Sequence, residues 1–218
     1  MADVEFFWDP ICPFAWITSR WVTTVAEERD LSVEWRFICL RLLNEGRDYD
    51  EFPDGYSELH TNGLRMLRVA SAARQEHGSD AMGPLYTAYG ESIWNRQPGE
   101  GMRGVGSPEH LRAALETAGR PEDLAAASED ASHDAGLRTE TEEALARTGD
   151  DVGTPIITFQ PPDGVSFFGP VISRVPETPA RACELWDAVL ELASWPGFAE
   201  IKRSARETPQ LPLLSRLG

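Results

Sequence analysis

The spacing of hydrophobic residues changes twice within the first forty positions of the chain. Residues 3–8 form a short apolar run that Asp9-Pro10 ends, as is typical of a strand followed by a turn. Between residues 13 and 29 the apolar side chains recur every three or four positions, which predicts an amphipathic helix. Alternation over residues 32–40 then predicts a second strand. A connection of this length favours two parallel strands joined by a right-handed crossover.

The pattern between residues 41 and 150 is helical and contains no convincing strand. Glycine and proline residues divide this stretch into five predicted helices. These helices cover residues 56–77, 82–96, 108–118, 121–132 and 138–148. Consecutive helices of this kind need a packing layer of their own, so we expect them to form an all-helical domain inserted after the second strand.

Strand signals return after residue 150 and lead into a last amphipathic helix. The strands predicted at residues 156–159 and 165–168 flank Pro161-Pro162-Asp163-Gly164, which predicts an antiparallel hairpin. A helix is predicted over residues 178–194 and a short one after Pro196. The chain is therefore predicted to be an α/β protein with the order βαβ, helical block, ββα. The expected boundaries are residues 1–40 and 151–218 for the α/β domain, and residues 41–150 for the inserted helical domain.

Composition and charge exclude several kinds of partner. Of the 218 residues, 41% are hydrophobic and 26% are charged, which is ordinary for a folded globular chain. The formal net charge of −16 repels phosphate backbones and anionic lipids, so we expect neither a nucleic acid nor a membrane as partner. Residues 1–5 lack the basic and apolar segments of a secretory signal, and we expect a cytoplasmic location.

One of the three cysteines is placed for chemistry. Cys12 directly precedes Pro13 at the start of the first predicted helix, where unpaired backbone amides and the helix dipole meet. Such a position lowers the pKa of a thiol, so we expect Cys12 to be a nucleophile. Cys39 and Cys183 lie in apolar periodic contexts that are typical of buried structural thiols. The four histidines are scattered without a metal-binding spacing, so we expect no metal site.

Three segments together resemble the DsbA-like branch of the thioredoxin superfamily. They are Phe-Trp-Asp-Pro-Ile-Cys-Pro-Phe-Ala-Trp from Phe7 to Trp16, Val-Gly-Thr-Pro from Val152 to Pro155, and Phe-Phe-Gly-Pro from Phe167 to Pro170. Within that branch the chain resembles the actinobacterial mycothiol-dependent nitroreductases in particular. The resemblance implies a thioredoxin-like fold with an inserted all-helical domain, which agrees with the element order predicted above.

The resemblance also implies a site for a low-molecular-weight thiol and a small-molecule substrate. Cys12 corresponds to the attacking cysteine, and Thr154-Pro155 corresponds to the family's cis-proline dipeptide. Trp8 and Phe14 are expected to wall a pocket for an aromatic or nitro-bearing substrate. Mycothiol is the implied co-substrate, no cofactor is expected to be tightly bound, and a homodimer fits the likeness. The residues expected to bind the thiol or the substrate are Trp8, Pro13, Phe14, Trp16, Gly153, Thr154, Pro155, Gly169 and Pro170.

The chain departs from the family pattern inside the active turn. The family's usual turn is Cys-Pro-Trp-Cys, whereas this chain has Cys12-Pro13-Phe14-Ala15. Because the second cysteine is absent, no disulfide closes within the turn, and a dithiol cycle through these two positions is excluded. A monothiol route remains, in which Cys12 forms a mixed disulfide and a low-molecular-weight thiol completes the cycle.

Two other kinds of function stay open. The residues after Cys12 are also similar to the turns of kappa-class glutathione transferases and 2-hydroxychromene-2-carboxylate isomerases, in which a hydroxyl steadies a bound glutathione thiolate. Those families commonly carry Ser-Asp-Arg after the Phe-Gly of the last strand, where this chain has Pro170-Val171-Ile172, so mycothiol is favoured over glutathione. Ala15 also leaves open a binding protein that keeps the pocket without catalysis.

Overall fold

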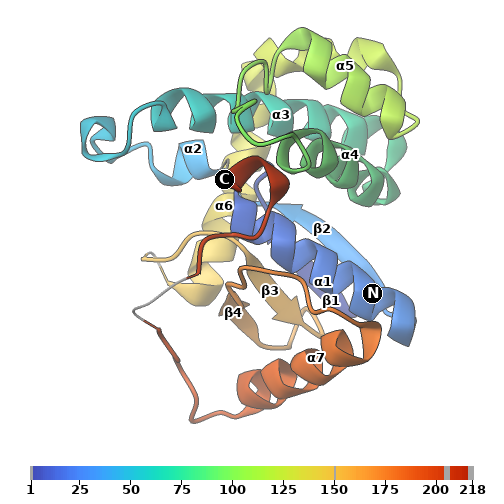
Figure 1. Ribbon diagram of the computed structural model, residues 1–218, viewed down its shortest axis with the longest axis vertical. Helices are drawn as coiled ribbons and strands as arrows, with labels where there is room; N and C mark the ends of the chain where they lie inside the picture. Colours follow the sequence, from blue (N-terminus) through green and yellow to red (C-terminus); the bar gives the residue numbers. More distant parts are fainter. Residues whose placement is uncertain (1, 150, 204–206, 216–218) are drawn as a thin grey trace.

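A four-stranded sheet with the strand order β2-β1-β3-β4 lies in the lower half of the molecule, among α1, α6 and α7 (Figure 1). The computed structural model describes residues 2–149, 151–203 and 207–215. β1 runs parallel to β2 and antiparallel to β3, and β3 pairs antiparallel with β4. The predicted parallel pair and the predicted hairpin are both confirmed. The strands are β1 (Val4–Trp8), β2 (Val33–Phe37), β3 (Ile156–Phe159) and β4 (Ser166–Phe168).

The helices fall into two groups (Figure 1). α1, α6 and α7 lie along the sheet, whereas α3, α4 and α5 gather beyond one end of it. The α-helices are α1 (Pro13–Arg29), α2 (Leu40–Leu43), α3 (Tyr56–His77), α4 (Met82–Trp94), α5 (Pro108–Thr117), α6 (Asp134–Thr148) and α7 (Pro179–Ser194). Short 3-10 helices connect or follow them: η1 (Tyr49–Glu51), η2 (Ser79–Ala81), η3 (Glu122–Glu129), η4 (Ala131–His133) and η5 (Pro212–Leu214).

Successive residues of β1 enter two separate hydrophobic cores, because side chains of a strand alternate between its faces. Phe6 and Trp8 belong to the main core, to which α1, α4 and α7 also contribute. Phe7 lies in a smaller core with Ala144 of α6. All five residues of β1 are buried. The sheet therefore has apolar packing on both faces, and the C-terminal end of β1 leads directly into the turn that carries Cys12.

Two predicted helices differ from those observed. Residues 121–132 form the 3-10 helices η3 and η4 in place of one α-helix. The Asp130 carboxylate accepts a hydrogen bond from the Ser132 amide at 2.9 Å and so starts a new turn within the stretch. The helix predicted from residue 138 begins earlier, at Asp134.

Two further predictions at element ends were wrong. The segment after Pro196 is a turn and not a short helix, with the Phe198 amide donating to the Trp195 carbonyl at 2.9 Å. Its Pro-Gly pair favours a turn. The second strand ends at Phe37, three residues before the predicted end, because Cys39 is already the N-cap of α2.

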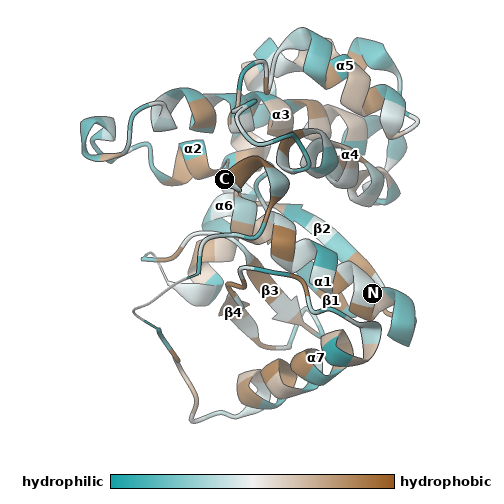
Figure 2. Cartoon of the chain, viewed as in Figure 1, coloured by the Kyte–Doolittle hydropathy of each residue, from teal (hydrophilic) through white to brown (hydrophobic). Residues whose placement is uncertain are grey.

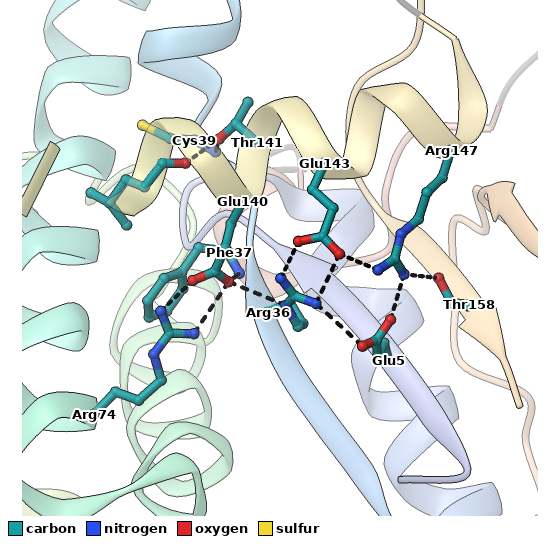
Figure 3. Close-up of polar contacts among 11 residues, drawn as sticks. Glu5, Arg36, Phe37, Cys39, Arg74, Glu140, Thr141, Glu143, Arg147 and Thr158 are labelled. Carbon is teal, nitrogen blue, oxygen red and sulfur yellow. Dashed lines mark hydrogen bonds and ion pairs between the residues drawn. The ribbon is translucent and has the colours of Figure 1, made fainter. Parts of the chain in front are cut away.

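An ion-pair network joins α6 to the sheet and to α3 (Figure 3). Arg36 of β2 lies 3.2 Å from Glu5 of β1 and 2.6 Å from Glu143 of α6. Glu140 of α6 pairs with Arg36 and also with Arg74 of α3. The side chains of Glu5 and Glu140 are only 10% and 12% exposed, so removing one partner leaves a largely buried charge and costs about 3–5 kcal/mol. Helix α6 thus contacts both the sheet and α3 of the second group of helices, and the domain boundaries at residues 40 and 150 stay a prediction.

Hydropathy follows this packing (Figure 2). β3, α1 and α7 carry brown, hydrophobic segments, whereas β2 is teal to pale and the loop beyond α2 is mostly teal. No helix among the described residues is long and apolar enough to span a lipid bilayer.

Candidate active site

Cys12 is the N-cap of α1, as the sequence predicts. Its backbone is extended, with φ −90° and ψ 112°, and Pro13 occupies the first turn of the helix. The Ala15 amide donates a hydrogen bond to the Cys12 sulfur at 3.4 Å, and the Trp16 amide donates to the Cys12 carbonyl at 3.1 Å. The sulfur therefore satisfies one of the amides that a helix leaves unpaired at its start.

A second segment approaches Cys12 from the other side. The Cys12 thiol donates to the Thr154 carbonyl at 3.5 Å, and the Thr154 hydroxyl donates to the Phe7 carbonyl at 3.2 Å. The Thr154–Pro155 peptide bond is cis, which is the geometry that the resemblance implies. The fold thus brings together segments that lie more than 140 residues apart in the sequence.

The third predicted segment lies directly behind this dipeptide. The Gly169 amide donates to the Pro155 carbonyl at 2.8 Å, and the Thr18 hydroxyl of α1 donates to the Pro170 carbonyl at 3.0 Å. Gly169 has a φ of 99°, in the left-handed region that favours glycine. Gly153, the remaining predicted residue of the dipeptide loop, is half-buried.

Burial dominates the electrostatics of the Cys12 thiol. The residue is 8% exposed, and burial raises its pKa to about 12 although the Ala15 amide acts in the opposite direction. The Asp9 carboxylate raises the pKa further, and the Phe14 amide lowers it. The lowered pKa expected from the helix dipole was wrong for this conformation, because loss of solvent outweighs the amide hydrogen bonds. In this conformation the raised pKa favours a neutral thiol, which donates to the Thr154 carbonyl.

Asp9 is a buried carboxylate, for which the sequence predicted no role beyond ending the first strand. It accepts hydrogen bonds from the Ile11 amide at 3.0 Å and from the Leu40 amide at 2.8 Å. Burial raises its pKa to about 7, against these two hydrogen bonds. Asp9 therefore ties the Cys12 turn to the start of α2. The sequence feature that could have indicated this role is the position of a charged residue between an apolar strand and the cysteine.

The aromatic residues near Cys12 are placed unequally. Trp8 is fully buried and stacks on Tyr86 of α4 with ring centroids 4.1 Å apart. It therefore walls no open pocket in this conformation, contrary to the expectation. Trp16 is 4% exposed, and the Arg20 guanidinium lies 4.2 Å from the centre of its ring. Phe14 and Pro13 are half-buried, so of the predicted aromatic residues Phe14 is the one that remains reachable.

Helix α4 contributes contacts that no local pattern indicated. The Trp94 indole donates to the Pro10 carbonyl in the Cys12 turn at 3.3 Å. Gly90 lies so close to Trp16 that an added Cβ would fall 2.1 Å from the ring. The only cue was the small residue on an otherwise apolar helix face, which is a weak signal on its own.

The other cysteines are free and lie elsewhere. Cys39 is fully buried and burial raises its pKa to about 12, whereas Cys183 on α7 is partly exposed. Among the described residues no group of three or more His, Cys, Asp or Glu side chains is placed to hold a metal ion. The chemistry that the site offers is therefore that of one sulfur between a helix start and a backbone carbonyl.

This chain is similar to one curated protein in sequence and to several solved structures in fold. A 27% identical relative, described as "Uncharacterized protein Rv2286c" of Mycobacterium tuberculosis, matches over 93% of this chain and 82% of its own length. The probable DsbA oxidoreductase SCO1869 from Streptomyces coelicolor superposes with a TM-score of 0.55 at 20% identity, covering 93% of this chain and 94% of that one. A 2-hydroxychromene-2-carboxylate isomerase superposes with a TM-score of 0.56 at 16% identity, covering 87% and 95%.

These structural likenesses show that the fold is the DsbA-like thioredoxin fold predicted from the sequence. A family model supplies the finer assignment. The model for the Rv2466c-like family, described as mycothiol-dependent nitroreductase Rv2466c, matches residues 11–203, which include the whole active turn from Cys12 onward. The chain therefore belongs to the Rv2466c-like family of mycothiol-dependent nitroreductases, a family of thiol-dependent oxidoreductases.

Proposed function

We propose that this protein is a mycothiol-dependent oxidoreductase that uses Cys12 as its single nucleophile. The observation that carries the proposal is the position of the Cys12 sulfur, 3.4 Å from the Ala15 amide and 3.5 Å from the Thr154 carbonyl. Ala15 stands where a second cysteine would close a disulfide. Two groups thus hold the sulfur, and no thiol within the turn competes for it.

In the proposed cycle, Cys12 takes part in two thiol–disulfide exchange steps and carries mycothiol as a mixed disulfide between them. The Cys12 thiolate attacks a mixed disulfide between the substrate thiol and mycothiol, and the substrate leaves as a thiolate that takes up a proton. A second mycothiol attacks the mycothiol sulfur of the Cys12 adduct and releases Cys12 as a thiolate. One mixed disulfide and one mycothiol are thereby converted into one free substrate thiol and one mycothiol disulfide.

A nitro-bearing substrate could accept the two electrons that mycothiol releases when its disulfide forms. Two mycothiol molecules lose two electrons and two protons when they form their disulfide, and these convert one nitro group into a nitroso group and water. We propose Phe14 as the aromatic surface for such a substrate, because it is half-exposed beside Cys12. The natural substrate is proposed only to this level of chemical class.

The neutral thiol must become a thiolate before it can attack. Burial is the largest cause of the raised Cys12 pKa, so entry of a polar ligand and its water reverses that effect. The Ala15 and Phe14 amides then stabilise the anion. Thr154, freed from the thiol proton, is positioned to accept from an amide of the bound mycothiol, with Gly153 allowing close approach.

Adduct formation with two disulfides tests the proposal. The protein is incubated with mycothiol disulfide or with glutathione disulfide. Its intact mass then reports whether an adduct has formed, and peptide mapping identifies the cysteine that carries the adduct. We expect a mycothiol adduct on Cys12 that Cys183→Ser retains and Cys12→Ser loses. Glutathione adducts without mycothiol adducts would overturn mycothiol as the co-substrate.

A thiol-dependent transferase or isomerase is the second candidate. The observation that favours it is the 3.5 Å contact between the Cys12 sulfur and the Thr154 carbonyl, in which the thiol donates a hydrogen bond as a serine hydroxyl does. In such a protein Cys12 would orient a bound thiolate without being oxidised. Activity that persists in Cys12→Ser, with no mixed disulfide trapped during turnover, would favour this candidate over the redox cycle.

A further inference from the structure

The C-terminal strap, defined here as residues 207–215, runs from the segment that follows Pro170 to α4. It consists of an extended stretch followed by η5 (Pro212–Leu214). In Figure 1 the red η5 lies in front of the start of α1, next to α4. The family match ends at residue 203, so the strap lies outside the region that matches the family model.

The first anchor of the strap lies on the segment that follows Pro170. The Gln210 amide donates to the Ser173 carbonyl at 2.7 Å, and the Ser173 hydroxyl donates to the Glu207 carboxylate at 2.6 Å. Arg174 lies 3.4 Å from the same carboxylate. This segment is the one that Thr18 and Pro155 hold beside Cys12.

The second anchor lies on α4. η5 packs against α4, and Leu211 and Leu213 are 7% and 8% exposed within the main core. The same helix touches the Cys12 turn, since the Trp94 indole donates to the Pro10 carbonyl. The strap thus connects two walls, the segment after Pro170 and α4, each of which also contacts residues around Cys12.

We propose that the C-terminal strap is an autoinhibitory closure of the Cys12 site, which must leave α4 before a low-molecular-weight thiol can reach the sulfur. The inference rests on the proposed function, because it takes such a thiol to be the partner of Cys12. Cys12 is 8% exposed while the strap is docked, and a pseudodisaccharide thiol is too large to enter a site of that accessibility. The anchor at Glu207 is exposed, and the described residues of the strap form no regular structure beyond the single turn η5, so the strap can open locally without unfolding the sheet.

Alkylation of Cys12 by iodoacetamide measures this closure directly. In Leu213→Asp, a carboxylate replaces a buried leucine, and we expect the strap to leave α4 and alkylation of Cys12 to become at least tenfold faster at constant pH. Leu214→Asp is the matched control, because Leu214 is on the same turn but 37% exposed, and its rate should stay within twofold of the wild type. Cys183, on α7, serves as an internal control in the same peptide map.

A second pair of variants avoids the core altogether. Glu207→Ala removes the contacts to Ser173 and Arg174, and we expect at least a threefold increase in the rate of Cys12 alkylation. Glu200→Ala is its control, because Glu200 lies in the same tail and pairs only with Lys202 among the described residues. Melting temperatures within a few degrees of the wild type identify the variants that remain folded.

The outcomes separate this inference from the proposed function. If Leu213→Asp and Glu207→Ala alkylate at the wild-type rate while mycothiol still adds to Cys12, the strap does not close the site and the proposed function stands. If both variants alkylate faster but take no mycothiol adduct, the closure is supported and mycothiol is the wrong thiol. If they gain both reactions together, both proposals are supported.

Discussion

The starts of α1 and α7 have the same local structure and different chemistry. Each helix begins with a proline in its first turn, preceded by a side chain that caps it. The Cys12 sulfur accepts from the Ala15 amide at 3.4 Å, and the Thr178 hydroxyl accepts from the Arg181 amide at 3.3 Å. Judged by the cap alone, the two sites are equivalent.

Their surroundings are not equivalent. Thr178 is exposed, whereas Cys12 is 8% exposed and also donates to the Thr154 carbonyl. The carboxylate of Asp9, fully buried in the same turn, adds a repulsive charge for any anion on Cys12. A helix start therefore predicts where a cap lies, while burial and neighbouring charges decide whether that cap is ionised.

Replacing each capping residue by alanine should give the largest difference in turnover between the two helix starts. Cys12→Ala removes the proposed nucleophile, so we expect mycothiol-dependent turnover to fall by roughly a thousandfold or more. The expected change in melting temperature is small, because a thiol is a weak hydrogen-bonding group. Steady-state turnover and thermal unfolding of the same preparation check this prediction. Turnover within tenfold of the wild type would remove Cys12 from the mechanism.

The pH dependence of alkylation comes next in size. With a pKa of about 12, roughly 0.01% of Cys12 is thiolate at pH 8, against roughly 24% for a free cysteine. The higher nucleophilicity of a more basic thiolate recovers roughly 40-fold, so ionisation alone is expected to make alkylation roughly 60-fold slower than for a free thiol, and the docked strap slows it further. The rate should rise with pH up to about pH 11 without levelling off.

The alkylation rate of Cys12 can be compared with that of a second cysteine in the same chain. Cys183 on α7 is partly exposed, and peptide mapping reports its alkylation in the same sample. A Cys12 rate that levels off below pH 7 would show a lowered pKa and restore the expectation from the helix dipole alone.

Local patterns were sufficient for most of the fold. The period change between β1, α1 and β2 and the Pro-Pro-Asp-Gly turn of the hairpin predict elements that the structure confirms. Each of these signals depends on residues close together in the sequence. The failures lie where a few residues decide the outcome, as at η3, where Asp130 divides a helix-like stretch.

The pKa of Cys12 and the role of Asp9 could not be predicted from local sequence patterns. The Cys12 thiol donates to Thr154, which is 142 positions away in the sequence, and the turn that carries Cys12 accepts from Trp94 of α4. Neither contact follows from a local hydrophobic period. Asp9 illustrates the same limit, because its second partner is the Leu40 amide after β2. The roles of these residues depend on long-range contacts, and a sequence read without them assigned Cys12 a pKa shift of the wrong sign.

Asp9 offers the third test of the contrast between the two helix starts. In Asp9→Asn the amide can accept from only one of the Ile11 and Leu40 amides and turns its own NH₂ toward the other. We expect this to cost about 1–3 kcal/mol of unfolding free energy. Chemical denaturation of the variant and of the exposed control Asp163→Asn measures the difference.

The sign of the pH dependence follows from the raised pKa of Asp9. Its folded pKa of about 7 lies above its usual value of 3.8, so the wild type loses stability as pH rises from about 4 through 7. Asparagine has no such titration, and the stability gap between wild type and variant should therefore narrow as pH rises. A gap that widens with pH would mean that the folded pKa of Asp9 lies below its usual value of 3.8. The variant should also lower the Cys12 pKa, because it removes the Asp9 charge.

The smallest expected effect is at the start of α7. Thr178→Ala removes the hydroxyl that caps the Arg181 amide, and we expect a loss of about 1 kcal/mol of unfolding free energy. That corresponds to about 2–4 °C in melting temperature for a chain of this size. Mycothiol-dependent turnover should be unchanged, because the exposed cap has neither a thiol nor a second backbone partner like that of Cys12. Thr178→Ser keeps the hydroxyl and should restore the stability. A loss of turnover in Thr178→Ala alone would show that α7 influences the Cys12 site, and the two helix starts would then not be independent.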